Sequence, residues 1–337
     1  MPDLRTTYLG LELANPLVPS ASPLSRSIDM ARRLEDAGAS ALVMYSLFEE
    51  AVAAEDEELA RFLHNQDIGH AEAMSFRPVP DDYRTTLDQY LEQLSALKEA
   101  LEIPVIASLN GISLSGWVEH GRSLEEAGAD ALELNVYYVA ADAHETAVDV
   151  ENRYLDLLRE LKGVVNIPVT MKLSPQFSSL PNFLTRVEEA GANGVALFNR
   201  FYQPDIDLET LQVSPVPQLS SSADSLLSMR WIAILHGRVG LSLAATGGIH
   251  TTEDVIKMLL AGADVTHLCS ALLRNGPEHL ALLRRGLDLW LEDHEYVSVA
   301  QMKGSVCYNN AVDPAAYERT NYLETLHGHY RALSAWR

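Results

Sequence analysis

The phrase Ala-Gly-Ala occurs four times before a short apolar run: AGASALVMYS (37–46), AGADALELNV (127–136), AGANGVALFN (190–199) and AGADVTHLCS (261–270). In each copy an amphipathic, charged segment precedes the phrase. Glycine just beyond a helix favours the left-handed conformation that ends it, and an apolar run of this length is typical of a buried strand. Each copy therefore predicts the end of a helix followed by a parallel strand.

A second set of apolar runs alternates with the first along the chain. It comprises NPLVPSAS (15–22), IPVIASLNG (103–111), IPVTMKLSP (167–175) and LSLAATGG (241–248). Together the two sets predict strands at about 16–21, 41–45, 104–108, 131–135, 168–173, 194–198, 241–246 and 265–269. Helical patterns fill the gaps, at about 27–37, 83–101, 114–127, 146–162, 178–190, 222–237, 252–261 and 277–292.

This alternation indicates an α/β protein whose parallel sheet closes into a single (β/α)₈ TIM barrel. A doubly wound open sheet is the competing topology, but its glycine-rich turn, G-x-G-x-x-G after the first strand, is missing. We expect the barrel to span residues 1–294, and a C-terminal tail, 295–337, to pack on it. An insertion at about 47–82 follows the second strand. It is expected to form either a lid or substrate-side wall, or a structural or oligomer-contact segment.

Composition excludes several classes of protein. The net charge is −22 at pH 7, and so acidic a surface repels phosphate backbones and anionic lipid, so we expect neither nucleic acid nor membrane as a partner. The two cysteines, Cys269 and Cys307, are too few for a four-cysteine cluster, and no spacing suggests a metal site. Without a signal-peptide pattern or an apolar run of membrane-spanning length, the expected location is cytoplasmic.

The strand ends carry the residues that suit chemistry, because active sites of such barrels lie where the strands end. These strand-end residues are Ser20, Ala21, Tyr45, Ser46, Ser108, Asn135, Lys172, Asn199, Arg200, Gly247, Gly248, Cys269, Ser270 and Ala271. Two glycines separate the seventh predicted strand from a helix that begins near Thr251, and small residues follow the eighth. Glycine lets backbone N–H groups approach an anion, so these two strand ends predict a phosphate site.

Lys172 ends a strand that is otherwise apolar, and an unpaired buried ammonium is costly, so its side chain must reach a pocket. It has three possible roles: to offset negative charge on a cofactor ring, to form a Schiff base with a carbonyl substrate, or to pair with a carboxylate at the mouth. Asn135 and Asn199 offer amides that both donate and accept. Such groups suit the edge of a planar heterocycle.

These strand-end residues resemble those of the dihydroorotate dehydrogenase family of FMN barrels. The matching phrases are NPLVPSAS (15–22), GADALELNV (128–136), MKLSP (171–175), GVALFN (194–199) and ATGGIHTTEDVIKMLLAGADVTHLCSA (245–271). The resemblance implies FMN at the mouth of the barrel and a role in pyrimidine biosynthesis.

The resemblance also implies a role for each matching residue. Ser20 and Ala21 would lie beside the isoalloxazine, and Ser46 and Ser108 near the ring or ribityl chain. Asn135 and Lys172 would contact the ring, where Lys172 offsets charge on the reduced flavin. The phosphate would be held by Gly247, Gly248, Cys269, Ser270 and Ala271.

The substrate side departs from the family pattern. The family has Lys-Ser where this chain has Tyr45-Ser46. After the asparagine that corresponds to Asn135, the family has a Ser/Cys-Pro-Asn run whose Ser or Cys is the catalytic base, whereas this chain continues Val136-Tyr137-Tyr138-Val139. Tyr138 thus occupies the position of the family's catalytic base. Because an unperturbed phenol has a pKa of about 10, it suits donating a proton, and the alternative role is an aromatic wall against the substrate. Tyr45, Asn135, Asn199 and Arg200 are expected to face the substrate.

The sequence therefore predicts an FMN-dependent oxidoreductase that interconverts dihydroorotate and orotate, or acts on a C–C bond of a similar planar, anionic ring. One alternative is a barrel lyase or aldolase with Lys172 as Schiff base and the phosphate on the substrate. Another is a non-catalytic flavin-binding component of a redox complex. With too few cysteines for its own cluster, the chain is expected to use a soluble electron acceptor or a partner redox subunit. A homodimer is the default expectation.

Overall fold

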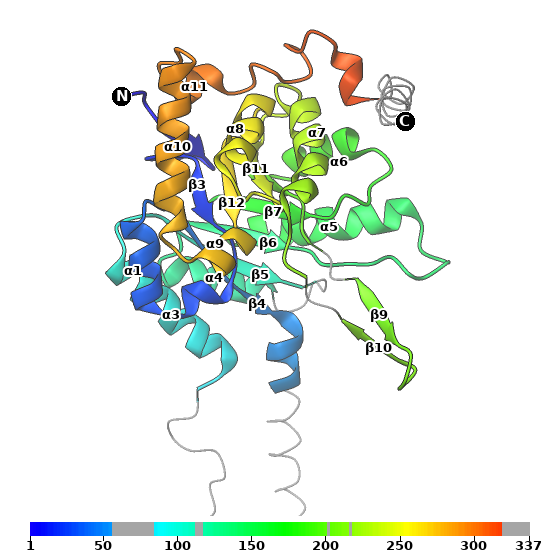
Figure 1. Ribbon diagram of the computed structural model, residues 1–337. Coiled ribbons are helices and arrows are strands. Elements are labelled where there is room, and N and C mark those ends of the chain that lie inside the picture. The colour runs from blue at the N-terminus through cyan, green and yellow to red at the C-terminus, as the bar shows by residue number, and fades with distance from the viewer. Residues whose placement is uncertain (56–83, 112–116, 201–202, 216–217, 319–337) are drawn as a thin grey trace, which may run out of the picture.

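The structure is a computed structural model that describes residues 1–55, 84–111, 117–200, 203–215 and 218–318 (Figure 1). Eight parallel strands form one sheet in the order β3-β12-β11-β8-β7-β6-β5-β4. They are β3 (Leu17–Pro19), β4 (Leu42–Phe48), β5 (Val105–Asn110), β6 (Ala131–Asn135), β7 (Val169–Leu173), β8 (Gly194–Leu197), β11 (Ser242–Thr246) and β12 (Val265–Leu268). Each overlaps one of the eight predicted strands.

The two ends of this sheet meet, which makes it a barrel. Ser40, just before β4, donates to the carbonyl of Leu17 in β3 through both its N–H (3.1 Å) and its hydroxyl (3.0 Å). The other neighbouring strands are joined by parallel ladders, of which the β4–β5 ladder has a register shift between Val43 and Ser46. The predicted TIM barrel is therefore confirmed, with a seam between β3 and β4.

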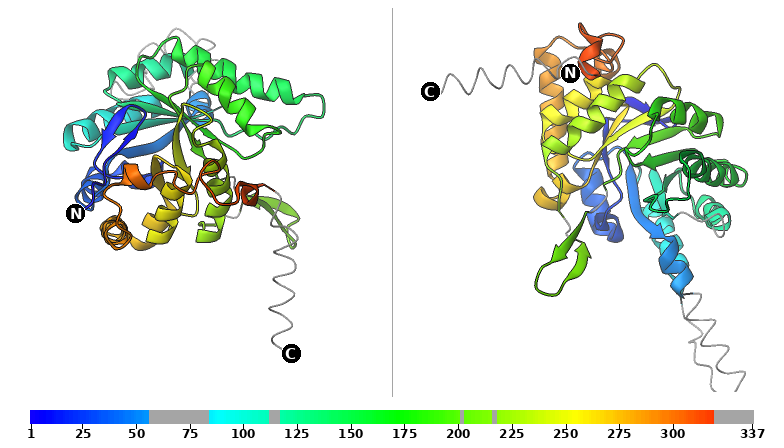
Figure 2. Two further views of the ribbon diagram at one scale, coloured as in Figure 1. Left: turned by 90° about the horizontal axis from the view of Figure 1, so that it is seen from above. Right: turned by 90° about the vertical axis from the view of Figure 1, so that its right-hand side faces the viewer.

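Helices surround the strands, as the sequence predicts (Figure 2). They are α1 (Ile28–Asp36), α3 (Thr86–Ala100), α4 (Trp117–Glu126), α5 (Ala147–Lys162), α6 (Leu180–Glu189), α7 (Ser225–Leu235), α8 (Thr252–Ala261) and α10 (His279–Asp293). The glycines of the four repeated phrases, Gly38, Gly128, Gly191 and Gly262, have φ angles of 105°, 98°, 101° and 118°. The predicted left-handed helix ends are thus confirmed, and the main core fills the space between helices and strands.

A short N-terminal hairpin, absent from the sequence prediction, closes the barrel at the end opposite the strand C-termini. It consists of β1 (Thr6–Tyr8) and β2 (Leu11–Leu13). The fully buried Tyr8 side chain packs among residues near the strand starts, including Val43 and Val265. Its hydroxyl donates to the Thr170 hydroxyl at 3.3 Å. Tyr8 therefore fills the lower interior of the barrel.

Replacing Tyr8 with alanine is expected to destabilise the fold by about 3–5 kcal/mol, because a large buried ring leaves a cavity that the strands cannot collapse around. Tyr8→Phe is the matched control. It keeps the ring and removes only one hydroxyl contact, worth about 1 kcal/mol. Urea unfolding of the three proteins measures both effects. Equal losses in the two variants would show that the hydroxyl, and not the ring, carries the stability.

Several elements lie outside the simple barrel pattern. Strands β9 (Pro204–Asp207) and β10 (Gln212–Pro215) form an antiparallel hairpin that stands away from the barrel near its mouth (Figures 1 and 2). Ile206 and Val213 lie opposite each other on it, 60% and 70% exposed. The remaining short helices are η1 (Pro23–Arg26), η3 (Ser222–Asp224), α9 (Ser270–Asn275), α11 (Val299–Met302) and η4 (Pro314–Tyr317).

The described part of the C-terminal tail, residues 295–318, lies against α7 and α8. The N–H groups of Gly304, Val306 and Tyr308 donate to the carbonyls of Leu259, Leu260 and Ala233, at 2.9, 3.0 and 2.9 Å. The division into a barrel (1–294) and a packed tail (295–337) stays our proposal. Residues 319–337 and most of the predicted insertion at 47–82 lie outside the described residues, so the role of that insertion stays a prediction.

Candidate active site

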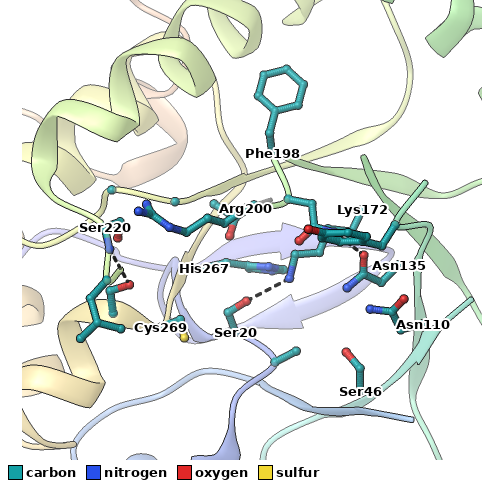
Figure 3. Close-up of a pocket in the computed structure, with 18 of the residues that line it drawn as sticks. Ser20, Ser46, Asn110, Asn135, Lys172, Phe198, Arg200, Ser220, His267 and Cys269 are labelled. Atoms are coloured by element: carbon teal, nitrogen blue, oxygen red, sulfur yellow. Dashed lines mark hydrogen bonds between the residues drawn. The ribbon is translucent and has the colours of Figure 1, made fainter. Parts of the chain in front are cut away.

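A cavity of about 550 Å³ opens at the C-terminal ends of the strands (Figure 3). Most of the strand-end residues singled out in the sequence line it: Ser20, Ala21, Ser46, Asn135, Lys172, Asn199, Arg200, Gly247, Gly248, Cys269 and Ser270. This volume lies within the range typical of cofactor and small-molecule sites. Among the described residues, no cluster of three metal-ligating side chains occurs.

Three neighbouring strands place polar side chains side by side at one wall of the cavity. Asn110, Asn135 and Lys172 are register partners at the ends of β5, β6 and β7. Register partners in a parallel sheet share a face, so all three side chains leave the barrel at the same level. The Asn199 amide donates to the Asn135 amide oxygen at 2.6 Å, which fixes which edge of Asn135 stays available.

Lys172 lies at the floor of the cavity and is only 7% exposed. Its ammonium donates to the Ser20 hydroxyl at 3.4 Å and to Glu133 Oε1 at 3.3 Å, and the Glu133 side chain is fully buried. The carboxylate compensates the ammonium, so Lys172 is positioned as a charged donor facing the cavity. Of the roles considered for it, pairing with a carboxylate is thus observed, although the partner lies below the mouth rather than on it.

His267 of β12 lies beside this ion pair, inside the barrel. Its Nδ1 is 3.8 Å from Glu133 Oε2, and the Ser108 hydroxyl donates to Glu133 Oε1 at 3.3 Å. Burial lowers the pKa of His267 to about 4; the Glu133 charge opposes this shift, and the Lys172 charge acts with burial. His267 is therefore neutral at pH 7.

The two glycines after β11 form a tight turn against the start of α7. Gly247 and Gly248 have φ angles of 87° and 75°. A Cβ on Gly248 would lie 2.3 Å from the backbone nitrogen of Ser225, whereas one on Gly247 would be 3.8 Å from its nearest neighbour, the Phe198 carbonyl oxygen. The capping box of Thr251 and Asp254 confirms the predicted start of α8. Both glycines line the cavity, and at Gly248 the packing against the start of α7 leaves no room for a side chain.

Small residues from two segments meet across from this turn. The Ser220 N–H donates to the Ser270 hydroxyl at 3.1 Å, and the Ser220 hydroxyl lies 3.0 Å from His250 Nε2. Burial raises the pKa of the Cys269 thiol, so it stays protonated at neutral pH. This side of the cavity therefore presents hydroxyl and backbone groups rather than charged side chains.

The two tyrosines that follow β6 point in different directions. Tyr137 lines the cavity, whereas Tyr138 does not. The Tyr138 hydroxyl donates to Glu145 Oε2 at 2.5 Å, and the Arg153 guanidinium lies over its ring at 4.5 Å. The hydrogen bond to Glu145 raises the pKa of Tyr138. The catalytic role assigned to Tyr138 stays a prediction, and it requires this hydroxyl to leave Glu145.

Three further candidates from the sequence do not line the cavity. Tyr45 packs edge-on against Tyr90 at 5.0 Å, with the Arg26 guanidinium over its ring at 4.3 Å. The Ser108 hydroxyl lies behind that of Ser46, at 2.9 Å, and Ala271 is fully buried. Their predicted cofactor and substrate contacts remain untested.

The structure also adds residues that sequence reasoning did not select for the site. Among the cavity-lining ones are Asn110, Tyr137, Phe198, Ser220, Thr246 and His267. Asn110 and His267 had an available signal, since each is a polar residue in a strand whose neighbours in sequence mark it as buried. Ser220 had none, because the segment before η3 carries no strand or helix pattern.

Comparison with known proteins identifies the class that this barrel and its strand-end site define. The family model for dihydroorotate dehydrogenase matches residues 81–291, more than half of the chain. The chain belongs to the dihydroorotate dehydrogenase family, and is accordingly an oxidoreductase that acts on CH–CH groups.

Curated relatives cover nearly the whole chain at modest identity. Subunit PreA of the NAD-dependent dihydropyrimidine dehydrogenase of Escherichia coli (strain K12) is 26% identical, over 95% of this chain and 80% of its own length. The catalytic subunit of dihydroorotate dehydrogenase B (NAD(+)) of Methanosarcina acetivorans is 26% identical, over 88% of this chain and 93% of its own. The corresponding catalytic subunit of Thermoplasma acidophilum is 25% identical, over 90% of this chain and 99% of its own length. All three are named as subunits, and their names give two different ring substrates.

Within the described residues, no helix has both the length and the apolar character that a bilayer crossing requires.

Proposed function

We propose that this protein is an FMN-dependent oxidoreductase that interconverts dihydroorotate and orotate, or oxidises or reduces a C–C bond of a similar planar, anionic ring. The observation that carries the proposal is the arrangement of the cavity. The Lys172 ammonium lies at its floor beside the amides of Asn110 and Asn135, and two left-handed glycines lie at its other side. A planar ring that gains negative charge on reduction and a phosphate are the ligand groups that such an arrangement suits.

The residues present fit FMN. The close packing of Gly248 against Ser225 brings bare backbone to the cavity, as a phosphate site requires. Gly247, Gly248, Cys269, Ser270 and Ala271 would hold the phosphate, and Ser20, Ala21, Ser46, Ser108, Asn135 and Lys172 the ring and ribityl chain. When bound, FMN supplies a two-electron acceptor and donor.

The chain's own groups account for the rest of the chemistry. Lys172 offsets negative charge at the ring, and the Asn135–Asn199 pair presents a fixed hydrogen-bonding edge to the substrate. Arg200 lines the cavity and approaches Asp224 only to 3.5 Å, so its guanidinium remains suited to an anionic substrate. The Lys172 side chain is paired with the buried Glu133 at 3.3 Å, and a paired lysine is a poorer Schiff-base nucleophile than a free amine, which favours the oxidoreductase over the lyase alternative.

The proposal is tested by the absorbance spectrum of the purified protein, followed by anaerobic addition of dihydroorotate. We expect flavin absorbance that bleaches on addition. A colourless protein that forms a borohydride-trapped adduct on Lys172 would establish the lyase. A tightly bound flavin that no ring compound reduces would establish a non-catalytic component of a redox complex.

Replacing Tyr138 with phenylalanine tests the proton donor. We expect turnover to fall about 100-fold, with loss of the alkaline limb of the pH profile, because the variant has no phenol to donate. Tyr137→Phe makes the same change on the cavity wall and is the matched control, for which we expect a small effect. Steady-state kinetics over the whole pH range measures both. The reverse result would make Tyr137 the donor, and two unaffected variants would leave the phenols as an aromatic wall.

We also propose that the chain forms a homodimer and passes electrons to a soluble acceptor or a partner redox subunit. The support for a partner is that the relatives compared above are named as subunits of NAD-dependent enzymes. Light scattering of the purified protein should give twice the mass of the chain. A mass equal to that of one chain would contradict the dimer.

A further inference from the structure

The interior of the barrel directly below the cavity is polar. Glu133, Ser108 and His267 point inward from β6, β5 and β12, and each of these side chains is at most 2% exposed. Barrel interiors are usually filled by branched apolar residues, and a buried carboxylate costs free energy unless it is paired and hydrogen-bonded. A glutamate at this position therefore calls for a role that an apolar residue would not perform.

Glu133 connects the cavity floor to the interior. Its Oε1 accepts from the Lys172 ammonium and the Ser108 hydroxyl, both at 3.3 Å. Its Oε2 faces His267 Nδ1 at 3.8 Å. Within the described part of the chain, neither Oε2 nor either nitrogen of His267 has a hydrogen-bond partner. One carboxylate thus contacts both the Lys172 ammonium and the His267 imidazole, two side chains that Figure 3 shows near each other in the cavity.

The charges around Lys172 follow from these surroundings. His267 is neutral because burial lowers its pKa to about 4, and burial raises the pKa of Tyr8, which packs edge-on against His267 at 5.7 Å. The Cys269 thiol is protonated as well, since burial raises its pKa. Of these interior groups, Glu133 is therefore the anion that balances Lys172. Its charge acts through a low-dielectric interior, where it is weakly screened.

We propose that Glu133 is the positioning residue of Lys172: it holds the ammonium at the cavity floor and, through its negative charge, limits the positive potential that Lys172 presents to a bound ring. His267 completes the site as a neutral side chain that adds no charge of its own. The second half of the proposal rests on the proposed function, because it takes the ring to be FMN.

The first experiment measures the reduction equilibrium of bound FMN against a reference dye. Glu133→Gln keeps the side-chain shape and an oxygen that accepts from Lys172, but removes the charge. We expect the ratio of reduced to oxidised flavin to rise about tenfold at a fixed potential, equivalent to about 30 mV for a two-electron couple. Lys172→Met should shift the ratio in the opposite direction.

Asp264→Asn is the matched control, since it also removes the carboxylate of a lysine–carboxylate pair, Lys303–Asp264 at 2.6 Å, but Asp264 does not line the cavity, so the variant should leave the ratio unchanged. A purely structural role for Glu133 predicts no shift in the ratio. An unchanged or lowered ratio in Glu133→Gln would overturn the electrostatic half of the proposal.

The second experiment needs no cofactor and uses thermal unfolding of the apoprotein. Glu133→Gln and Lys172→Met should each lower the midpoint, because each leaves the partner's charge buried and alone. The double variant carries neither charge, so its shift should be smaller than the sum of the two single shifts. If a single variant fails to fold while the double variant folds, that result also supports the coupling of Glu133 and Lys172. Additive shifts would overturn the positioning role.

The two experiments separate the two possible failures. A colourless protein whose midpoints are coupled would reject FMN while supporting the Lys172–Glu133 unit. A yellow protein with additive midpoint shifts and an unshifted flavin ratio would support FMN binding while rejecting the proposed role of Glu133.

Discussion

Lys172→Met is expected to lower kcat/KM for the ring substrate by about 1,000-fold. A fixed charge at a site of developing negative charge is worth on the order of 100- to 1,000-fold in rate when it acts in a water-excluded cavity. The ammonium of Lys172 is almost fully buried and held by Glu133 and Ser20. It therefore needs to move little as negative charge develops on the ring. Methionine keeps the length of the side chain and removes the charge. Steady-state kinetics with the FMN-loaded protein measures the effect.

Loss of stability has to be separated from loss of chemistry in this variant. Lys172→Met leaves the Glu133 carboxylate buried without its partner, which costs about 3–5 kcal/mol. Adding Glu133→Gln should restore much of this stability without restoring turnover. Lys303→Met is the matched control: Lys303 is also a partly buried lysine paired with a carboxylate, Asp264 at 2.6 Å, but lies in the tail. If the kcat/KM of Lys172→Met is within a few-fold of that of the unaltered protein, the proposed role of the lysine is wrong.

Gly248→Ala is expected to abolish retention of the phosphate-bearing cofactor and to lower stability. Alanine at a φ of 75° costs about 1–2 kcal/mol by itself. Its Cβ would also lie 2.3 Å from the Ser225 nitrogen and 2.8 Å from both the Asp224 carbonyl carbon and the Ser221 carbonyl oxygen. These are backbone atoms around η3 and at the start of α7, so the turn itself must move. We expect the Kd for FMN to rise at least about 100-fold, or about 2.7 kcal/mol.

Gly247→Ala provides a close control for this prediction. Its φ of 87° gives a similar backbone cost, but its Cβ would meet nothing closer than 3.8 Å. We therefore expect a smaller loss of stability and weaker interference with binding. Fluorescence titration with FMN and thermal unfolding measure the two effects. Equal losses in both variants would mean that left-handed strain, and not the packing against α7, sets the requirement for glycine at position 248.

The repeated phrase explains why the fold could be predicted from the sequence. Each Ala-Gly-Ala copy combines a helix end with a buried strand, and local signals of this kind do not depend on distant contacts. The β1–β2 hairpin was missed because its strands have three residues each and follow no repeat. The packing of Tyr8 into the barrel is a long-range contact, with Thr170 as its hydrogen-bond partner, and no local sequence pattern predicts it.

The candidate site could be predicted less completely than the fold. Strand ends identify which residues reach the mouth, but not which way a side chain turns once the strand has ended. Tyr137 and Tyr138 are adjacent, and the contacts of Glu145 and Arg153 decide that Tyr138 faces α5 instead of the cavity. Glu133 is different, because a glutamate between Leu132 and Leu134 in a buried strand is visible in the sequence. The inward direction of its side chain depends on the register of β6 with its neighbours.

The seam between β3 and β4 gives the mouth of the barrel an uneven stiffness. Ser20 follows β3 and Ser46 lies in β4, so these two serines stand on either side of a joint held by the N–H and hydroxyl of Ser40. Asn110, Asn135 and Lys172 lie instead on strands joined by unbroken ladders. Regions with fewer backbone hydrogen bonds open at lower free energy. We therefore expect the part of the mouth built on β5, β6 and β7 to keep its shape, and the seam between Ser20 and Ser46 to be the place where the mouth widens most easily.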